Sequence, residues 1–406
     1  MNILHVVPTY YPAVRYGGPI WSVHGLASSL AARGHNVHVY TTNVDGEGTL
    51  PVPVGRPIQI NGVTVWYFRT GFGRRLYRSP MMDQKLEENV KQFDIVHLHS
   101  VFLWPTSSAA RAARAAGVPY VLSPRGMLVT DLIDRKNFFA KRAWINLFER
   151  RNIEKAAAVH VTSNVEASEL KALRFRCTRT EIVANGIERS DDESFETNSR
   201  AGVGIARRDA DPYVLFLGRI NWKKGLDRLI PAMEYVPGAR LLIAGNDEEN
   251  YRSKLEVLAR RFCVIDRIHF LGPIHGKRKW ELLESARLLA LPSYSENFGN
   301  VVLEAMAVGC PVIVTPEVGV ANMVVEVGCG VVCNGEPECL GAEIRELFRD
   351  HERRQRMSQA GRDAVKHHFS WRAISDRMLN LYTEVLADRS KGPGEGSNPK
   401  FRDNPA

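Results

Sequence analysis

Residues Ser293 to Pro316 read SYSENFGNVVLEAMAVGCPVIVTP and contain the pattern that decides the fold. The apolar run immediately before them, Leu288–Leu291, predicts a buried strand, and Val301 to Val308 has the apolar spacing of a helix for which Asn300 is a suitable N-cap. A second apolar run, Pro311–Val314, follows a turn that contains glycine. A strand, a helix and another strand in this order predict a β-α-β unit with parallel strands.

The same alternation continues along the chain in two series, and its fully apolar strands predict parallel sheets covered by helices on both faces. Each series therefore predicts one doubly wound, Rossmann-like α/β domain, in which ligands bind at the carboxyl ends of the strands. The strands of the first series are Ile3–Val7, Val37–Thr41, Thr64–Phe68, Ile95–Leu98, Tyr120–Leu122, Val159–Thr162 and Glu181–Val183, and those of the second are Tyr213–Leu217, Arg240–Ala244, Ile268–Leu271, Leu288–Leu291, Pro311–Val314 and Gly330–Val332. The helix-like segments between them include Trp21–Arg33, Leu226–Met233, Tyr251–Phe262 and Lys277–Ser285.

A polar stretch divides the two series. Residues 188–211 carry no sustained apolar period and predict an interdomain linker, so the domains are expected over residues 1–187 and 212–370. The last residues, 389–406, are rich in glycine, proline and charge and predict a disordered tail.

Bulk composition narrows the class of protein. Of the 406 residues, 44% are hydrophobic and 24% are charged, which is typical of globular domains, and no apolar run approaches the ~20 residues of a membrane-spanning helix. The first residues lack the features of a signal peptide, and the six cysteines, without paired CxxC spacing, are expected to be reduced thiols of a cytoplasmic protein. The net charge of +9 favours anionic partners, but no recognition motif for nucleic acid accompanies it.

Glu296 and Glu304 are separated by seven residues across the predicted strand-to-helix loop. Glu296 is expected at the carboxyl end of the strand and Glu304 one turn inside the helix, whose N-terminal amides favour a diphosphate. Carboxylates beside such a site can accept hydrogen bonds from ribose and sugar hydroxyls. Two solvated charges on a helix face would give the same spacing, but the glycine-containing loop and the flanking strands favour a ligand site.

Two cations follow the first strand predicted in the second domain. Gly218 to Gly225 read GRINWKKG, which places Arg219 and Lys224 where they can neutralise a departing diphosphate. Taken alone, the segment is also explained by solvent-exposed bases, and Lys223 fits that description. Its agreement with the two glutamates favours a phosphate clamp.

These segments resemble the E-x7-E and GR-x4-KG signatures of retaining GT-B glycosyltransferases of the group-1 (GT4-type) family, and the resemblance covers nearly the whole chain. It implies two Rossmann-like domains that face a cleft, a UDP- or GDP-sugar as donor, and no cofactor. It also implies that Glu304 holds the donor ribose, that Glu296 contacts the donor sugar, and that Arg219 and Lys224 bind its phosphates. The backbone that would cradle the sugar and diphosphate belongs to Asn297, Phe298, Gly299, Asn300 and Val301.

The first domain has two matching elements. Gly17 and Gly18 follow the first strand and precede a helix, which allows a phosphate or sugar to approach the backbone closely, although such a pair is also common in plain turns. His97 and His99 share one face of a predicted strand, where a histidine is ordinarily a packed, hydrogen-bonded residue. The resemblance implies that Gly17 and Gly18 face donor or acceptor, that His99 is a catalytic residue at the donor sugar, and that His97 is structural.

Three further features concern the ligands and the domain arrangement. Arg125 stands where many members of the family carry a His-Gly element, and two roles fit it equally: contact with a phosphate of the donor or acceptor, and a salt bridge between domains. The resemblance implies that the backbone near Ile274 lines the nucleobase. It also implies that an amphipathic helix over residues 371–388 crosses back onto the first domain.

Residues 135–155, RKNFFAKRAWINLFERRNIEK, combine seven Lys or Arg with aromatic and aliphatic side chains. A basic helix of this composition predicts contact with an anionic membrane surface, while packing on the first sheet is the alternative. A dual role is favoured, with a peripheral position on the inner face of the cell membrane and a sugar or lipid-linked acceptor.

The expected reaction retains the anomeric configuration, with Glu296 binding the donor rather than attacking it, unlike the carboxylate pair of retaining glycosidases. No DxD-like element lies at a predicted strand end, so no metal is expected. Polysaccharide or lipid-linked oligosaccharide assembly is what the family suggests. The competing interpretations are a nucleotide-sugar epimerase and a non-catalytic nucleotide- or phospholipid-binding protein.

Overall fold

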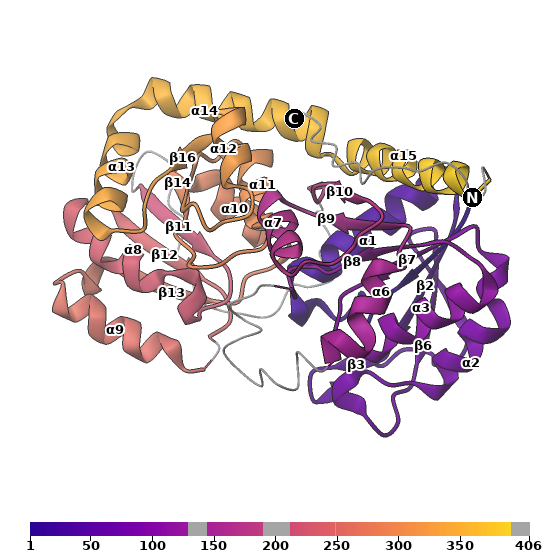
Figure 1. Ribbon diagram of the computed structural model, residues 1–406. Helices are drawn as coiled ribbons and strands as arrows, with labels where there is room; N and C mark the ends of the chain where they lie inside the picture. The colour runs from indigo at the N-terminus through magenta and orange to yellow at the C-terminus, as the bar shows by residue number, and fades with distance from the viewer. Residues whose placement is uncertain (129–143, 190–211, 248, 391–406) are drawn as a thin grey trace. The chain divides into compact units, whose positions relative to one another are not determined.

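The computed structural model describes residues 1–128, 144–189, 212–247 and 249–390. Most of the predicted linker and nearly all of the predicted tail lie outside these residues. The chain forms two compact units: Met1–Gly186 with the helix that begins at Trp371 make the first, and Ile187–Ser370 make the second. Both are sheets with helices packed on their faces (Figure 1).

The first unit is built on an eight-stranded sheet with the order β10-β9-β8-β7-β1-β2-β6-β5. All neighbouring strands are parallel except β5 and β6. The strands are β1 (Asn2–Val6), β2 (Asn36–Thr42), β5 (Pro57–Ile60), β6 (Val63–Phe68), β7 (Ile95–His99), β8 (Tyr120–Ser123), β9 (Ala158–Val161) and β10 (Thr180–Ile182), and a separate hairpin joins β3 (Val44–Asp45) to β4 (Gly48–Thr49). The α-helices are α1 (Gly18–Ala32), α2 (Pro80–Asn89), α3 (Trp104–Ala116), α6 (Arg150–Glu154), α7 (Asn164–Ala172) and α15 (Trp371–Ser390).

The second unit has a six-stranded parallel sheet with the order β13-β12-β11-β14-β15-β16. Its strands are β11 (Tyr213–Leu217), β12 (Arg240–Ala244), β13 (Ile268–Gly272), β14 (Leu288–Leu291), β15 (Val312–Val314) and β16 (Gly330–Val332). Its α-helices are α8 (Leu226–Ala232), α9 (Tyr251–Arg261), α10 (Gly276–Ser285), α11 (Asn300–Ala307), α12 (Ala321–Val327), α13 (Pro337–Arg349) and α14 (His351–Ala364). The predicted fold class, two doubly wound parallel-sheet domains, is confirmed.

The strands are largely apolar because helices bury both faces of each sheet. In β1, Leu4 and Val6 belong to one core cluster, and Ile3 belongs to the cluster on the other face. Alternate side chains of a strand lie on opposite faces of the sheet, and here helices cover both faces. The lack of such burial explains why the apolar pattern did not predict one strand, β5. β5 is a short edge strand that begins with proline and has half of its residues exposed, so it lacks a continuous apolar run.

The cap of α11 differs from the prediction. Asn300 is the first residue of the helix, and Gly299, with a φ of 99°, occupies the cap position. A left-handed backbone at this point favours glycine over the asparagine that capping preferences had indicated.

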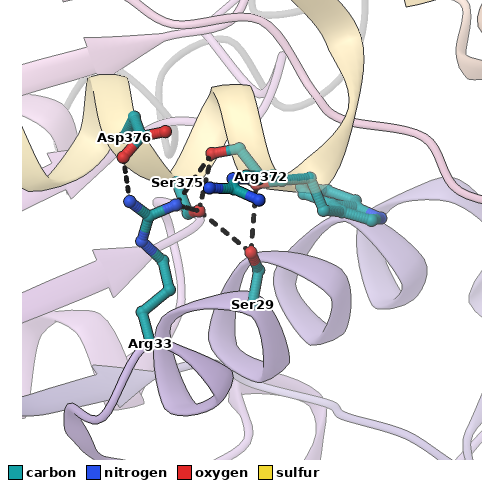
Figure 2. Close-up of polar contacts among 6 residues, drawn as sticks. Ser29, Arg33, Arg372, Ser375 and Asp376 are labelled. Atoms are coloured by element: carbon teal, nitrogen blue, oxygen red, sulfur yellow. Dashed lines mark hydrogen bonds and ion pairs between the residues drawn. The ribbon is translucent and has the colours of Figure 1, made fainter. Parts of the chain in front are cut away.

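The C-terminal helix α15 is part of the first unit's core. Ile374, Met378, Leu381 and Val385 are buried with α1 residues on one face of the sheet. Figure 2 shows the polar contacts beside them, in which the Ser29 hydroxyl lies 2.9 Å from the Ser375 hydroxyl. Arg33 forms an ion pair with Asp376, but these side chains are partly exposed, so the apolar contacts contribute most of the stability.

Trp371, the first residue of α15, lies in a slot that two glycines leave open. A Cβ added to Gly25 of α1 would lie 2.1 Å from Trp371 Cε2, and one added to Gly186 would lie 2.5 Å from Trp371 Cε3. Only residues without a side chain fit against the indole at these points.

We expect Gly25→Ala to lower the melting temperature, because the added methyl overlaps the indole and such overpacking costs about 1–3 kcal/mol, partly offset by alanine's higher helix propensity. Thermal unfolding followed by circular dichroism measures the change. Gly48→Ala is the control, since the nearest atom to its added Cβ is 3.6 Å away. Trp371→Phe should rescue Gly25→Ala in the double variant, and strict additivity would contradict the slot.

Candidate active site

The predicted donor residues of the second unit meet at the point in its sheet where the strand order reverses. From β11 the chain passes to β12 on one side, whereas β14 pairs with β11 on the other side. In open α/β sheets, the crevice at the carboxyl ends of two such strands is where ligands bind. The segment 218–225 leaves β11 here, and the segment 292–299 leaves β14.

Lys224 and Glu296 form an ion pair across this point. Lys224 Nζ donates to Glu296 Oε2, and the two side chains are only 14% and 20% exposed. Water screens such a pair less than it screens pairs on the open surface. The structure therefore brings together two residues that the sequence had assigned to one site from motifs some 70 positions apart.

Gly225 explains why the cationic segment ends in glycine. Its φ of 68° is left-handed, and a Cβ at this position would lie 1.9 Å from the carbonyl oxygen of Pro292. The backbones that follow β11 and β14 are therefore in direct contact, and this contact sets the approach of Lys224 to Glu296. Any larger residue would force the two loops apart.

The loop that carries Glu296 is held by the segment that follows β15. The Glu296 amide donates to the Glu317 carbonyl at 3.2 Å, and the Gly319 amide donates to the Glu296 carbonyl at 2.8 Å. A Cβ on Gly319 would lie 1.9 Å from the Asn297 carbonyl oxygen. These contacts fix the backbone of Glu296, so that its carboxylate has a defined position.

Glu304 has a cationic partner that sequence reasoning missed. Lys279 Nζ of α10 donates to Glu304 Oε1 at 3.0 Å, and both side chains are mostly buried. Lys279 also lies over the ring of its neighbour Trp280, 4.6 Å from the ring centroid. In the sequence it is one base among three in GKRKW, and only the packing of α10 beside α11 distinguishes it from Lys277 and Arg278.

The remaining predicted donor residues surround these pairs. Asn297, Phe298 and Gly299 form the loop before α11, and Asn300 and Val301 are its first residues, so their amides lie at the helix N-terminus as expected. Arg219 is exposed directly after β11. Ile274 follows β13 and is buried, so only its backbone could reach a nucleobase.

In the first unit, Gly17 and Gly18 lie at the start of α1, after β1 and a short 3-10 helix. Gly17 caps the helix with a φ of 70°, and no atom lies within 4 Å of a Cβ placed on it. The position requires glycine for its backbone conformation rather than for packing, and the space beside it is open.

His99 is buried at the carboxyl end of β7, where both ring nitrogens have partners. Arg125 Nη2 lies 3.2 Å from His99 Nδ1, and His5 Nδ1 lies 2.9 Å from His99 Nε2. Because a guanidinium can only donate, Nδ1 of His99 is the acceptor and Nε2–H donates to His5. Contact with a sugar, as predicted for His99, therefore requires one of these partners to be displaced.

Arg125 is half-buried and has a left-handed backbone, with a φ of 57°. Its Nη1 donates to Asn185 Oδ1 at 3.0 Å, and burial lowers its pKa to about 10. The described partners of Arg125 belong to the first unit. This placement leaves the predicted phosphate contact open.

His97 is part of a directed chain of buried hydrogen bonds, consistent with its predicted structural role. His160 Nε2 can only donate to the Val183 carbonyl at 2.9 Å, so its Nδ1 accepts from the Ser123 hydroxyl at 2.6 Å. Ser123 Oγ then accepts from His97 Nε2 at 2.7 Å, and His97 Nδ1 accepts from the Tyr382 hydroxyl of α15 at 2.6 Å. One arrangement of protons satisfies every member of the chain.

His5, His97 and His99 also offer nitrogens within 4.8 Å of one another, the spacing of a metal site. The surroundings do not suit a cation. Arg125 donates to His99, and the nitrogens of His97 and His99 are already in use. Among the ring nitrogens of these three described histidines, only His5 Nε2 lacks a hydrogen-bond partner.

Burial keeps these histidines neutral. It lowers the pKa of His5 and of His160 to about 3, with the Arg125 charge contributing, and it lowers those of His97 and His99 well below the usual value. Unfolded histidines take up protons near pH 6.5, so below that pH the unfolded state binds more protons than the folded one. Stability should therefore fall as the pH falls from about 6.5 towards 3, by about 1.4 kcal/mol per pH unit for each histidine.

We predict that the melting temperature decreases from pH 7 to pH 5 and that His160→Gln weakens this dependence, because glutamine does not titrate. Differential scanning calorimetry at a series of pH values measures both. His367→Gln, at an exposed position, is the control and should leave the pH dependence unchanged. An equal pH dependence in His160→Gln and the unsubstituted protein would refute the assignment.

Comparison with known proteins agrees with the geometry. Residues 203–364 match the family model for glycosyl transferases group 1, and residues 17–186 match that for the glycosyl transferase 4-like domain. The chain is 32% identical to a D-inositol 3-phosphate glycosyltransferase of Xylanimonas cellulosilytica, over 96% of this chain and 97% of that protein.

Solved structures show the same fold. A sucrose-phosphate synthase from Thermosynechococcus elongatus has a TM-score of 0.74 at 21% identity and covers 96% of this chain and 100% of its own. HepE of Anabaena, in complex with UDP-glucose, has a TM-score of 0.71 at 19% identity, with 95% and 100% covered. The fold is GT-B, and the chain belongs to the group-1 glycosyltransferases.

Proposed function

We propose that this glycosyltransferase moves a sugar from a UDP- or GDP-sugar to a lipid-linked or polysaccharide acceptor, with retention of configuration and without a metal ion. The observation that carries the donor assignment is the pair of Lys–Glu contacts, Lys224–Glu296 and Lys279–Glu304, at the switch point of the second sheet. HepE, whose solved complex holds UDP-glucose, supports a uridine nucleotide as the first donor to test.

The two ion pairs balance the charge of the site, because each lysine neutralises a carboxylate. A bound diphosphate would attract Lys224 and Arg219, while sugar hydroxyls would donate to the released Glu296 and ribose hydroxyls to Glu304. The site would thus exchange internal pairs for ligand contacts, without leaving a charge buried alone.

The proposed chemical step is a front-face attack that retains the anomeric configuration. The bond between the anomeric carbon and the phosphate oxygen breaks, and a bond to the acceptor oxygen forms on the same face of the sugar. The acceptor proton passes to the departing phosphate oxygen. Lys224, Arg219 and the amides at the start of α11 stabilise the charge that develops on the leaving group.

The first unit would supply the acceptor side. Gly17 provides open backbone beside Gly18, and Arg125 is a cation for a phosphate on donor or acceptor. His99 would contact the donor sugar after Arg125 or His5 moves from its ring. The relative from Xylanimonas cellulosilytica is named for a phosphorylated polyol, which is consistent with an acceptor that carries phosphate.

Residues 129–143 lie outside those described, so the membrane contact proposed for residues 135–155 is supported here by the part that begins at residue 144. In the remainder, Ile145 and Ile153 are buried whereas Leu147 is 71% exposed, which supports the dual role expected for this segment. None of the helices among the described residues is long and apolar enough to cross a bilayer.

The donor site is tested by paired substitutions. Lys224→Ala should lower kcat about 100-fold to 1000-fold, the usual loss when one stabiliser of developing charge is removed. Glu304→Ala should raise the donor KM about tenfold to 100-fold, because the ribose loses charge-assisted hydrogen bonds. Lys223→Ala is the matched control.

Initial rates with several UDP- and GDP-sugars measure these effects, after a screen for donors that raise the melting temperature. Product analysis by NMR reports the anomeric configuration. Isomerised donor without transfer would identify an epimerase. Donor binding without turnover, unchanged by Lys224→Ala, would identify a non-catalytic binding protein.

We also expect the transfer rate to be the same in excess EDTA and in millimolar Mg²⁺ or Mn²⁺, because lysine, arginine and helix amides take the role of a metal at the diphosphate. Rates with a dialysed enzyme measure this. A rate that falls in EDTA and returns with the ion would overturn the metal-independent proposal.

A further inference from the structure

The loop between β6 and α2 presents an aromatic side chain to solvent among arginines. Phe72 is 93% exposed, and Leu76 and Met81 in the same segment are also exposed. Arg69, Arg75 and Arg78 are exposed around them. From Gly48 to Met82 the sequence contains five arginines and no Asp or Glu, so this stretch, which Glu47 and Asp83 flank, carries a net positive charge.

Two hydrogen bonds close this loop on itself, and a third connects it to the segment that follows β3. The Gly71 amide donates to the Arg78 carbonyl at 3.1 Å, and the Ser79 hydroxyl donates to the Arg69 carbonyl at 2.7 Å. Arg74 Nη2 donates to the Gly46 carbonyl at 3.1 Å. Phe72 is therefore exposed on a loop whose backbone is held by hydrogen bonds.

The anchors also connect the loop to the glycine pair of α1. Tyr77 shares a side-chain hydrogen bond with Tyr16, which raises the pKa of Tyr77 after the larger effect of burial. The Gly46 amide donates to the Tyr16 hydroxyl at 2.7 Å. Tyr16 immediately precedes Gly17 and Gly18, so the exposed loop and the proposed acceptor-facing backbone share one support.

We propose that the segment Arg69–Met81 contacts an anionic lipid bilayer, with Phe72 inserted at the headgroup boundary and Arg69 and Arg75 on the lipid phosphates. A fully exposed phenylalanine loses unfavourable hydration when it enters an interface, and arginines beside it are attracted to an anionic leaflet. The combination of both features favours a bilayer over an acidic protein surface, which would use the arginines but not the isolated aromatic tip.

Contact with the bilayer would bring a lipid-linked acceptor to the first unit. A lipid-linked acceptor held in the bilayer would lie next to the Tyr16-Gly17-Gly18 backbone without leaving the membrane. In this respect the inference rests on the proposed function. The bilayer contact itself does not depend on the donor chemistry, because every residue involved belongs to the first unit.

The full-length protein is tested by co-sedimentation with vesicles of phosphatidylglycerol and phosphatidylcholine. We expect binding that rises with the phosphatidylglycerol fraction. Phe72→Ser should weaken the partition coefficient about tenfold, and Arg75→Gln about fivefold. Added salt should reduce the effect of Arg75→Gln but leave that of Phe72→Ser.

Val257→Ser is the matched control, because Val257 is 64% exposed on α9 of the second unit. Melting temperature and donor binding, measured without vesicles, should be unchanged in all three variants, which separates this proposal from that of the donor site. Absence of binding to phosphatidylglycerol vesicles, or equal weakening by Val257→Ser and Phe72→Ser, would overturn it. Capture of an acidic protein without vesicle binding would do the same.

Discussion

The close contact between the backbones that follow β11 and β14 is the constraint on which the proposed donor site depends. Parallel pairing brings the two carboxyl ends to one edge, and the missing side chain of Gly225 lets the loops touch at the Pro292 carbonyl. Lys224 and Glu296 then meet without long, flexible connections. In a site built in this way the backbone is fixed in advance, so ligand binding would rearrange only side chains, and charges held in place are those that stabilise a transition state most effectively.

The two units treat charge in opposite ways. The second unit keeps lysine and carboxylate in partly buried pairs, which a charged ligand can divide. In the first unit, burial keeps four histidines neutral, and Arg125 is the charged group beside them. A diphosphate suits the former environment, whereas the latter suits neutral hydroxyls and a single anionic group.

The sequence predicted the parts of the fold that follow from continuous burial. Every predicted strand is present within about one residue, because a strand buried on both faces is apolar along most of its length. The edge strand β5 and the cap at Gly299 were not predicted, since one depends on partial exposure and the other on a backbone angle. For the site, motif spacing was sufficient to place Lys224 with Glu296. Lys279 and the histidine chain could not be found in this way, because their partners come from helix packing and from strands far apart in the sequence.

The position of α15 in the chain has a consequence for how the protein is made. Synthesis runs from the N-terminus, and N-terminal domains usually complete their folding first. Here the buried residues Ile374 to Val385, and the Tyr382 hydroxyl that begins the histidine chain, are translated only after the entire second unit. During synthesis the first unit must therefore wait with part of one face of its core uncovered, although its other elements are translated before the second unit.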